Sequence, residues 1–123
     1  MSLEKKRRAV GRGRTGERLA AWLLIFKGYR ILERGWRAPV GEIDLIARRG
    51  GTLVFVEVKA RPELDEAQAA VHPAQQARIV RAAAAFVQSR PALARCVRRF
   101  DLIAVAPGRL PRHLADAWRP EPD

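Results

Sequence analysis

Apolar residues recur at helical spacing near the start of the chain and predict a first helix. Leu19, Leu23 and Phe26 are three or four positions apart, which places their side chains on one face of a helix. Thr15 has the side chain of an N-cap, so the helix is expected to begin there. Gly28 tolerates the left-handed backbone that commonly ends a helix, so the helix is expected to stop just before it.

The next three segments have the composition of strands. Residues 29–37 alternate loosely between apolar and polar, and Pro39 separates them from two stronger runs at 41–48 and 52–60. The Gly50-Gly51 pair between those two runs is typical of a tight hairpin turn. The pattern therefore predicts an antiparallel hairpin that follows a first strand.

The second half of the chain predicts one long helix and one buried strand. Pro73 suits the first turn of a helix that runs to about Ser89. The apolar stripe of this helix consists of Ile79, Ala83, Phe86 and Val87. Residues 61–72 are a polar connection, and Pro91 opens a short turn or helix. The run 99–106 is apolar almost throughout, as a strand buried on both faces must be.

This order of elements predicts an α/β fold in which a mixed sheet is flanked by helices. We assign residues 15–107 to a single domain of this kind. Residues 1–14 are basic and glycine-punctuated, and they are expected to form a flexible arm. Residues 108–123 are rich in proline and are expected to form an irregular C-terminal tail.

The composition of the chain adds expectations about compartment. No apolar run approaches the ~18 residues that a membrane helix needs, so no membrane association through a span is expected. The basic N-terminus lacks the apolar segment that follows it in a secretory signal. Cys96 is the one cysteine of the 123 residues and cannot form an internal disulfide. A reducing, cytoplasmic location is the expectation.

The charge of the chain points to its partner. Lys and Arg number 24 against 13 Asp and Glu, which gives a formal net charge of +11. A polyanion is the natural partner for such a chain, whether a nucleic acid or an anionic membrane surface. Most of the basic residues are arginines, whose guanidinium groups bind phosphate oxygens in pairs, and this favours nucleic acid slightly.

The hairpin carries a group of charged residues whose register can be derived. A tight turn at Gly50-Gly51 pairs the residues on either side of it, and opposite positions in an antiparallel hairpin keep a constant sum. Asp44 then lies across from Glu57, and Glu42 lies across from Lys59. Opposite side chains share a face, with Cβ atoms roughly 4.5–5.5 Å apart.

Two carboxylates that face each other in an apolar strand pair repel each other, and burial increases the cost. A divalent cation removes this repulsion, because Mg²⁺ prefers carboxylates, waters and phosphate oxygens as ligands. Lys59 lies two residues beyond Glu57, on the same face, where it can orient a water or stabilise charge on a phosphate. The alternative is a solvated face with a Glu42–Lys59 ion pair, which the apolar character of residues 52–60 disfavours.

These residues also resemble a known family. The segments GEIDLIARR and LVFVEVKARP look like the core of the PD-(D/E)xK nucleases, with an acidic residue on one strand and Glu-x-Lys on the next. The chain closely resembles the YraN-like family of predicted bacterial endonucleases, which is similar to archaeal Holliday-junction resolvases. The likeness extends from Gly16 to about Val105, and it implies a restriction-endonuclease-like fold.

The resemblance implies a role for each matching position. The implied catalytic residues are Glu17, Asp44, Glu57 and Lys59. The implied ligands of Mg²⁺ or Mn²⁺ are Asp44, Glu57 and the backbone carbonyl of Val58. The residues expected to contact nucleic acid are Arg12, Arg14, Arg18, Arg61, Gln76 and Arg78. Glu17 has an alternative role, since an acidic residue also interacts favourably with a helix N-terminus.

One position departs from the family pattern. The family usually has lysine followed by glutamine at the start of the second long helix, and this chain has Gln75 and Gln76 there. Gln76 matches, whereas Gln75 removes a positive charge. The departure bears on substrate affinity more than on metal binding.

The sequence is compatible with two functions from different classes. The first is metal-dependent hydrolysis of phosphodiester bonds in DNA, in branched or otherwise structured DNA if the resolvase likeness extends to substrate. The second is a nucleic-acid-binding module of nuclease fold that does not cut. A basic protein bound to anionic membrane or ribosomal RNA is a weaker third reading. Resolvases cut two strands symmetrically as dimers, so a homodimer remains open.

Overall fold

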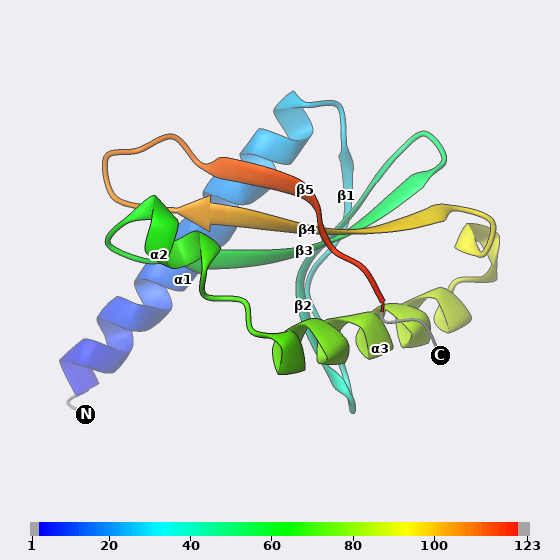
Figure 1. The fold of residues 1–123 in the computed structure, drawn as a ribbon, viewed down its shortest axis with the longest axis horizontal. Coiled ribbons are helices and arrows are strands. Elements are labelled where there is room, and N and C mark those ends of the chain that lie inside the picture. Colours follow the sequence, from blue (N-terminus) through cyan, green and yellow to red (C-terminus); the bar gives the residue numbers. More distant parts are fainter. Residues whose placement is uncertain (1–2, 121–123) are drawn as a thin grey trace.

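A computed structural model describes residues 3–120, with side chains from Thr15 onwards, and it has helices on both sides of one sheet (Figure 1). The helices are α1 (Leu3–Phe26), α2 (Leu64–Gln68), α3 (Pro73–Ser89) and the short 3₁₀ helix η1 (Pro91–Leu93). The strands are β1 (Arg30–Ala38), β2 (Gly41–Arg49), β3 (Thr52–Ala60), β4 (Val97–Val105) and β5 (Arg112–Trp118).

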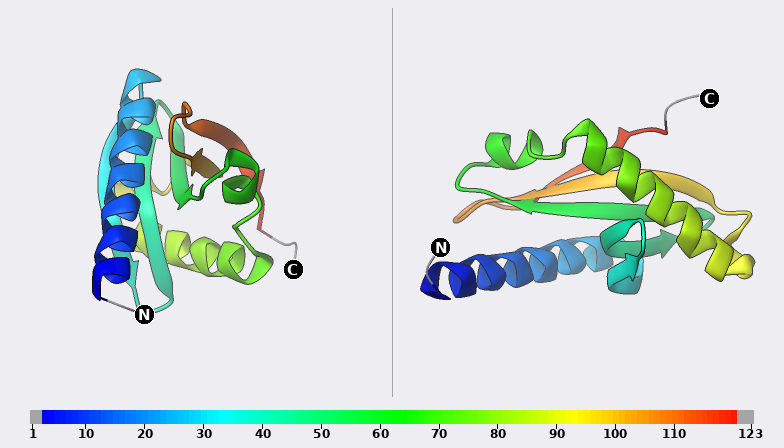
Figure 2. Two further views of the ribbon diagram at one scale, coloured as in Figure 1. Left: turned by 90° about the vertical axis from the view of Figure 1, so that its left-hand side faces the viewer. Right: turned by 90° about the horizontal axis from the view of Figure 1, so that it is seen from below.

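The sheet has five strands in the order β1-β2-β3-β4-β5. The β3–β4 pair is parallel and the other three pairs are antiparallel, so the sheet is mixed. Figure 2 shows α1 on one face of the sheet and α3 on the other. Each helix covers its own apolar core, one containing Leu24, Val56 and Ile103 and the other containing Phe55, Phe86 and Phe100. The predicted α/β fold is confirmed.

Most predicted elements are confirmed, including the hairpin and the helix that begins at Pro73. All four residues of the predicted α3 stripe are buried. The Gly50-Gly51 turn is present, with Gly50 at a φ of 59°. The burial pattern of β4 shows six consecutive buried residues at its end, as expected for a strand covered on both faces.

The first helix differs from its prediction at its start and in its buried face. α1 begins at Leu3, so the N-cap predicted at Thr15 is wrong, and the backbone of residues 3–14 is helical in place of the expected flexible arm. Lys, Arg, Glu and Ala are good helix formers and outweigh the two glycines there. Its buried residues include Ala20 and Leu24, whereas Phe26 is exposed. Gly28 has a φ of 92° and follows the helix end as predicted.

The chain after β4 is more regular than its proline content predicts. Residues 112–118 form β5 and pair with β4, so an irregular tail is the wrong description of this part. Pro111 and Pro120 flank the strand and leave its interior free of proline, and proline is excluded only from the ladder itself. The polar connection 61–72 likewise contains α2. Among the described residues, no helix is long and apolar enough to cross a membrane.

The pairing between β2 and β3 stops before the strands do. The predicted register is confirmed from Arg49↔Thr52 to Leu45↔Val56, where the ladder ends. Beyond that point β2 continues beside β1, and β3 continues beside β4 (Figure 1). We call this divergence the fork. The predicted backbone pairings of Asp44 with Glu57 and of Glu42 with Lys59 are therefore both absent from the ladder, because the two strands have already diverged at these positions.

Candidate functional site at the fork

Asp44 occupies the point where β2 leaves β3. Its Oδ2 atom accepts a hydrogen bond from the backbone N–H of Val58 at 2.8 Å. A backbone N–H of an interior strand needs an acceptor, and β2 no longer supplies a carbonyl here. The Asp44 side chain takes the place of the missing backbone partner. It thereby holds a carboxylate within the sheet at the start of the fork.

Glu57 brings a second carboxyl group to the same point. It lies on β3, is 6% exposed, and is hydrogen-bonded to Asp44. Lys59 Nζ lies 3.4 Å from Glu57 Oε1, and the Lys59 side chain is itself mostly buried. From the first turn of α3, Gln75 Nε2 donates a hydrogen bond to the same Oε1 at 3.0 Å. Two strands and one helix therefore converge on one pair of carboxyl groups.

Burial and mutual repulsion shift the protonation of this pair. Burial raises the pKa of Glu57, the negative charge of Asp44 raises it further, and the nearby Lys59 offsets only part, so that the pKa is about 8. Burial also raises the pKa of Asp44, although its hydrogen bonds from Val58 and Glu57 oppose the shift. The two carboxyl groups influence each other's protonation, and the raised pKa of Glu57 keeps this carboxyl group largely protonated near neutral pH.

Glu17 approaches the site from α1. Burial raises its pKa, and the negative charges of Asp44 and Glu42 raise it further. Glu17 is half-buried, whereas Glu42 is exposed and forms an ion pair with Arg37 at 3.6 Å. The structure therefore brings Glu17, Asp44, Glu57 and Lys59 into one neighbourhood, with Glu17 at its rim.

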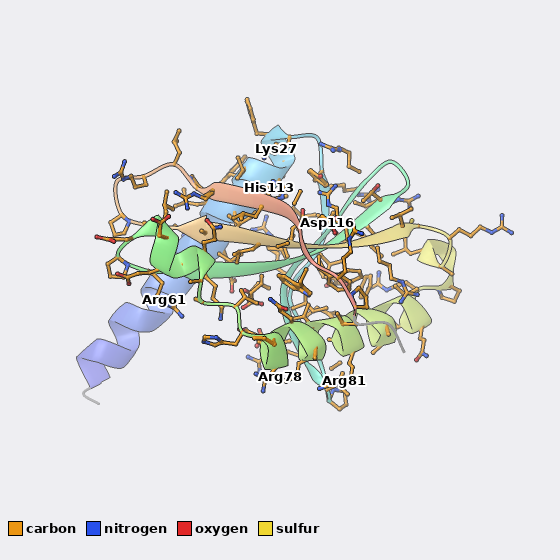
Figure 3. All side chains as sticks on the ribbon, viewed as in Figure 1. Lys27, Arg61, Arg78, Arg81, His113 and Asp116 are labelled. Carbon is orange, nitrogen blue, oxygen red and sulfur yellow. The ribbon has the colours of Figure 1, made fainter. Side chains whose placement is uncertain are left out.

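The residues expected to contact nucleic acid are distributed around the fork. Arg18 is exposed on α1, Arg61 follows β3 directly, and Arg78 is exposed on α3. Figure 3 shows Arg61 beside α2, and Arg78 and Arg81 along α3. Gln76 is half-buried at the start of α3, and the neighbouring Gln75 is the residue that contacts Glu57. Arg12 and Arg14 lie in the part of α1 whose side chains are outside the described residues.

The donor set can be tested for its fit to a hard cation. Val58 donates its N–H into the fork, and in a strand the N–H and C=O of one residue point to the same side, so its carbonyl faces the fork too. Two carboxyl groups and one carbonyl are oxygen ligands of the kind Mg²⁺ and Mn²⁺ accept. Among the side chains of residues 15–120, no three His, Cys, Asp or Glu groups are close enough to hold a metal together. Ligation here would need the backbone oxygen.

A second polar cluster lies on the α1 face of the sheet and was not predicted from the sequence. Asp101 is fully buried and accepts hydrogen bonds from Arg99 Nε at 2.9 Å, His113 Nε2 at 2.8 Å and the Asp116 N–H at 3.0 Å. Arg99 also donates to the Tyr29 hydroxyl, and Lys27 Nζ lies 2.9 Å from His113 Nδ1. These contacts join β4 and β5 to the turn between α1 and β1.

Neither the Asp101 cluster nor the contact of Gln75 with Glu57 was predicted from the sequence, and only the cluster had a partial signal. Arg99 and Asp101 are two apart in an otherwise apolar strand, and this alternation predicts that they share a face. His113 follows a proline-rich loop, and no spacing rule links it to Asp101. The contact of Gln75 with Glu57 depends on how α3 crosses the sheet, which no local pattern encodes.

The architecture and the site together define a class of protein. A mixed five-stranded sheet flanked by helices, with its acidic residues on adjacent central strands, is that of the restriction-endonuclease-like α/β proteins. Residues 16–105 match the model of the family described as "Uncharacterised protein family UPF0102". The chain belongs to this UPF0102 family.

Individual relatives match most of the chain. A UPF0102 protein of Paramagnetospirillum magneticum is 54% identical over 115 residues, which cover 90% of this chain and 89% of the relative. A UPF0102 protein of a Bradyrhizobium strain is 54% identical, covering 89% of this chain and 78% of the relative. A UPF0102 protein of Brucella canis is 50% identical, covering 90% and 88%.

Proposed function

We propose that this protein is a metal-dependent endonuclease that hydrolyses phosphodiester bonds in DNA, with its site at the fork. The observation that carries the proposal is the contact between the carboxyl groups of Asp44 and Glu57 at the end of the β2–β3 ladder. A buried pair of acids costs stability when both are ionised. Lys59 beside the pair and the basic residues around it match the charges of a phosphate-containing substrate.

Each residue has a distinct task in this proposal. Asp44, Glu57 and the Val58 carbonyl would hold Mg²⁺ or Mn²⁺, which when bound neutralises phosphate charge and lowers the pKa of a coordinated water. Lys59 donates hydrogen bonds toward the phosphate oxygens or the attacking water. Glu17, at the rim, accepts a hydrogen bond from a water approaching the site. Arg18, Arg61 and Arg78 bind flanking phosphates, and Gln75 keeps the Glu57 carboxyl in one orientation.

A second candidate function is binding of nucleic acid without cleavage. It is favoured by the pKa of Glu57, which burial and the charge of Asp44 raise to about 8, and by Gln75, which brings a neutral donor to this carboxyl group. A protonated carboxyl group is a poor cation ligand. A chain with a positive surface and a weak metal site would still bind DNA through its arginines, and its affinity would fall steeply with salt.

Cleavage assays separate the two functions. Labelled four-way junctions, single strands and duplexes are incubated with Mn²⁺ or Mg²⁺, and the wild type should cut at least one of them. Asp44→Asn is the sharpest variant, because its amide oxygen can still accept from the Val58 N–H while the ligand charge is lost. Arg90→Ala, a change on the far end of α3, is the matched control and should retain cleavage.

The metal assignment has its own measurement. Calorimetric titration with Mn²⁺ should show one site in the wild type and at least a tenfold loss of affinity in Glu57→Ala. Equal Mn²⁺ affinity in the two proteins would refute the assignment. Binding of all three DNA forms without cleavage across metals and pH would leave the binding module as the function.

A further inference from the structure

The outer face of α1 carries large apolar side chains that the fold leaves exposed. Leu19 is 42% exposed, Trp22 is 69% exposed and Phe26 is 89% exposed. With Thr15 they are spaced by four, three and four residues, so they form one stripe along the helix. The stripe is about 16 Å long at the rise of an α-helix. Figure 2 shows that α1 lies on one face of the sheet with no further element on its outer side.

One end of this α1 stripe, defined as Thr15, Leu19, Trp22 and Phe26, opens into a pocket. The pocket has a volume of about 650 Å³, within the usual range of small-molecule sites. Thr15 and Leu19 form one wall, and the ends of β3 and β4 with the loops that follow them form the other. Arg61 and Arg109 are the charged residues of its lining. The lining of the pocket is thus mostly apolar, and its two guanidinium groups come from Arg61 and Arg109.

The pocket adjoins the fork through consecutive residues. Gly16 lines the pocket, and Glu17 next to it approaches Asp44. Ala60 lines the pocket, and Lys59 before it contacts Glu57. A nucleic-acid strand with one phosphate at the fork would therefore need to pass only around the end of β3 to reach the α1 stripe.

The charge around the stripe fits an anionic occupant. Arg18 is exposed and precedes Leu19 in the sequence, and Lys27, whose Nζ contacts His113 Nδ1, follows Phe26. Between residues 15 and 30 the sequence contains one acidic residue, Glu17, and its pKa is raised by burial and by the negative charges of Asp44 and Glu42. A second copy of the same chain, with a net charge of +11, would bring like charges together across the stripe.

We propose that the α1 stripe and its pocket bind an unpaired strand of the nucleic-acid substrate. Bases stack on the indole of Trp22 and the ring of Phe26, one base enters the pocket, and Arg61 and Arg109 contact the phosphates beside it. The position of this strand relative to the fork rests on the proposed nuclease function. The substrate class is then DNA with a single-stranded segment next to the phosphate that is cut.

The proposal is tested by binding in the absence of divalent metal, so that cleavage plays no part. Fluorescence anisotropy in EDTA compares a labelled single-stranded oligothymidylate with a duplex of the same length. Trp22→Ala and Phe26→Ala should each weaken single-strand binding about tenfold and change duplex binding far less. Val97→Ala, which alters an exposed apolar residue at the opposite end of β4, is the matched control and should change neither.

Further readouts exclude other occupants. Thermal unfolding of each variant checks that it folds. Because Trp22 and Phe26 are exposed, the melting temperatures should equal that of the wild type. Equal losses for single strand and duplex, or no loss for either, would overturn the proposal. So would a wild-type dimer that Trp22→Ala dissociates, or binding to anionic vesicles without binding to the oligonucleotide. Cleavage of the same oligonucleotides by the wild type in Mn²⁺ is measured separately, so a failure of the nuclease function is distinguished from a failure of single-strand binding.

Discussion

The side-chain amide of Gln75 donates a hydrogen bond to Glu57 Oε1 at 3.0 Å, and so joins α3 directly to the acidic pair at the fork. The family resemblance of the sequence implies a lysine at this position, where this chain has glutamine. The same geometry that holds a neutral donor here would hold an ammonium group against the same oxygen. The charge of the side chain at position 75 should therefore influence the pKa of Glu57.

Replacement Gln75→Lys should lower the pKa of Glu57 from about 8 by one unit or more, because an opposite charge within a few ångströms favours the ionised form. Carboxyl-carbon NMR titration measures this value directly. Gln76→Lys is the matched control, since its neighbour is the residue in contact with Glu57. An unchanged pKa in Gln75→Lys would mean that the contact does not govern the pair.

The metal-free protein should become less stable as the pH rises through 8. The pKa of Glu57 is raised on folding, so its contribution is fully present below the unfolded value near 4.5 and is lost as the pH passes the folded value near 8. Between pH 6 and 8 the wild type should lose on the order of 2 kcal/mol relative to Glu57→Gln. Urea unfolding at both pH values gives the difference, and parallel pH profiles would contradict the shift.

Binding of Mn²⁺ should strengthen with pH over the same range. The cation must displace the proton on Glu57, so the affinity should rise by up to about tenfold per unit between pH 6 and 8 and then level off. Calorimetry in buffers of different ionisation enthalpy also counts the released proton. In Gln75→Lys the rise should occur at lower pH. A flat profile in the wild type would place the cation elsewhere.

The Asp101 cluster should act on stability and leave metal binding intact. Burial alone would raise the pKa of Asp101, but hydrogen bonds from His113, Arg99 and the Asp116 N–H outweigh it and lower the pKa to about 2. Asp101→Asn removes the charge that Arg99 faces and should cost about 3 kcal/mol or more in urea unfolding. The wild-type contribution is present above the unfolded value near 3.8 and is lost as the pH falls toward 2.

Asp116→Asn is the control for this cluster, because its side chain pairs with Arg119 at the surface and its backbone N–H, which reaches Asp101, is unchanged. Its unfolding midpoint should match the wild type. If Asp101→Asn is equally harmless, the buried network contributes nothing measurable to folding.

Local patterns predicted the parts of this fold that depend on local physics. The alternation in 41–60 and the Gly50-Gly51 turn determined the hairpin register as far as Leu45↔Val56, one position before Asp44 and Glu57. The sequence did not predict where that ladder ends, because the end depends on Asp44 replacing a backbone acceptor for Val58. It also placed Phe26 on the predicted apolar stripe of the first helix, since spacing alone does not distinguish a stripe that packs from one that faces solvent.

The fork has a consequence for how this chain can change over evolution. Asp44 satisfies the N–H of Val58, so the residue that would bind a cation also completes the backbone pairing of the sheet. A lineage with no further use for the chemistry could not replace this aspartate with an apolar residue without leaving an amide unpaired in the centre of the domain. Retention of an acid or an amide at position 44 is thus a weak marker of activity. The Glu57 side chain accepts no such backbone hydrogen bond, so the replacement of Glu57 in a relative would be the clearer sign that activity has been lost.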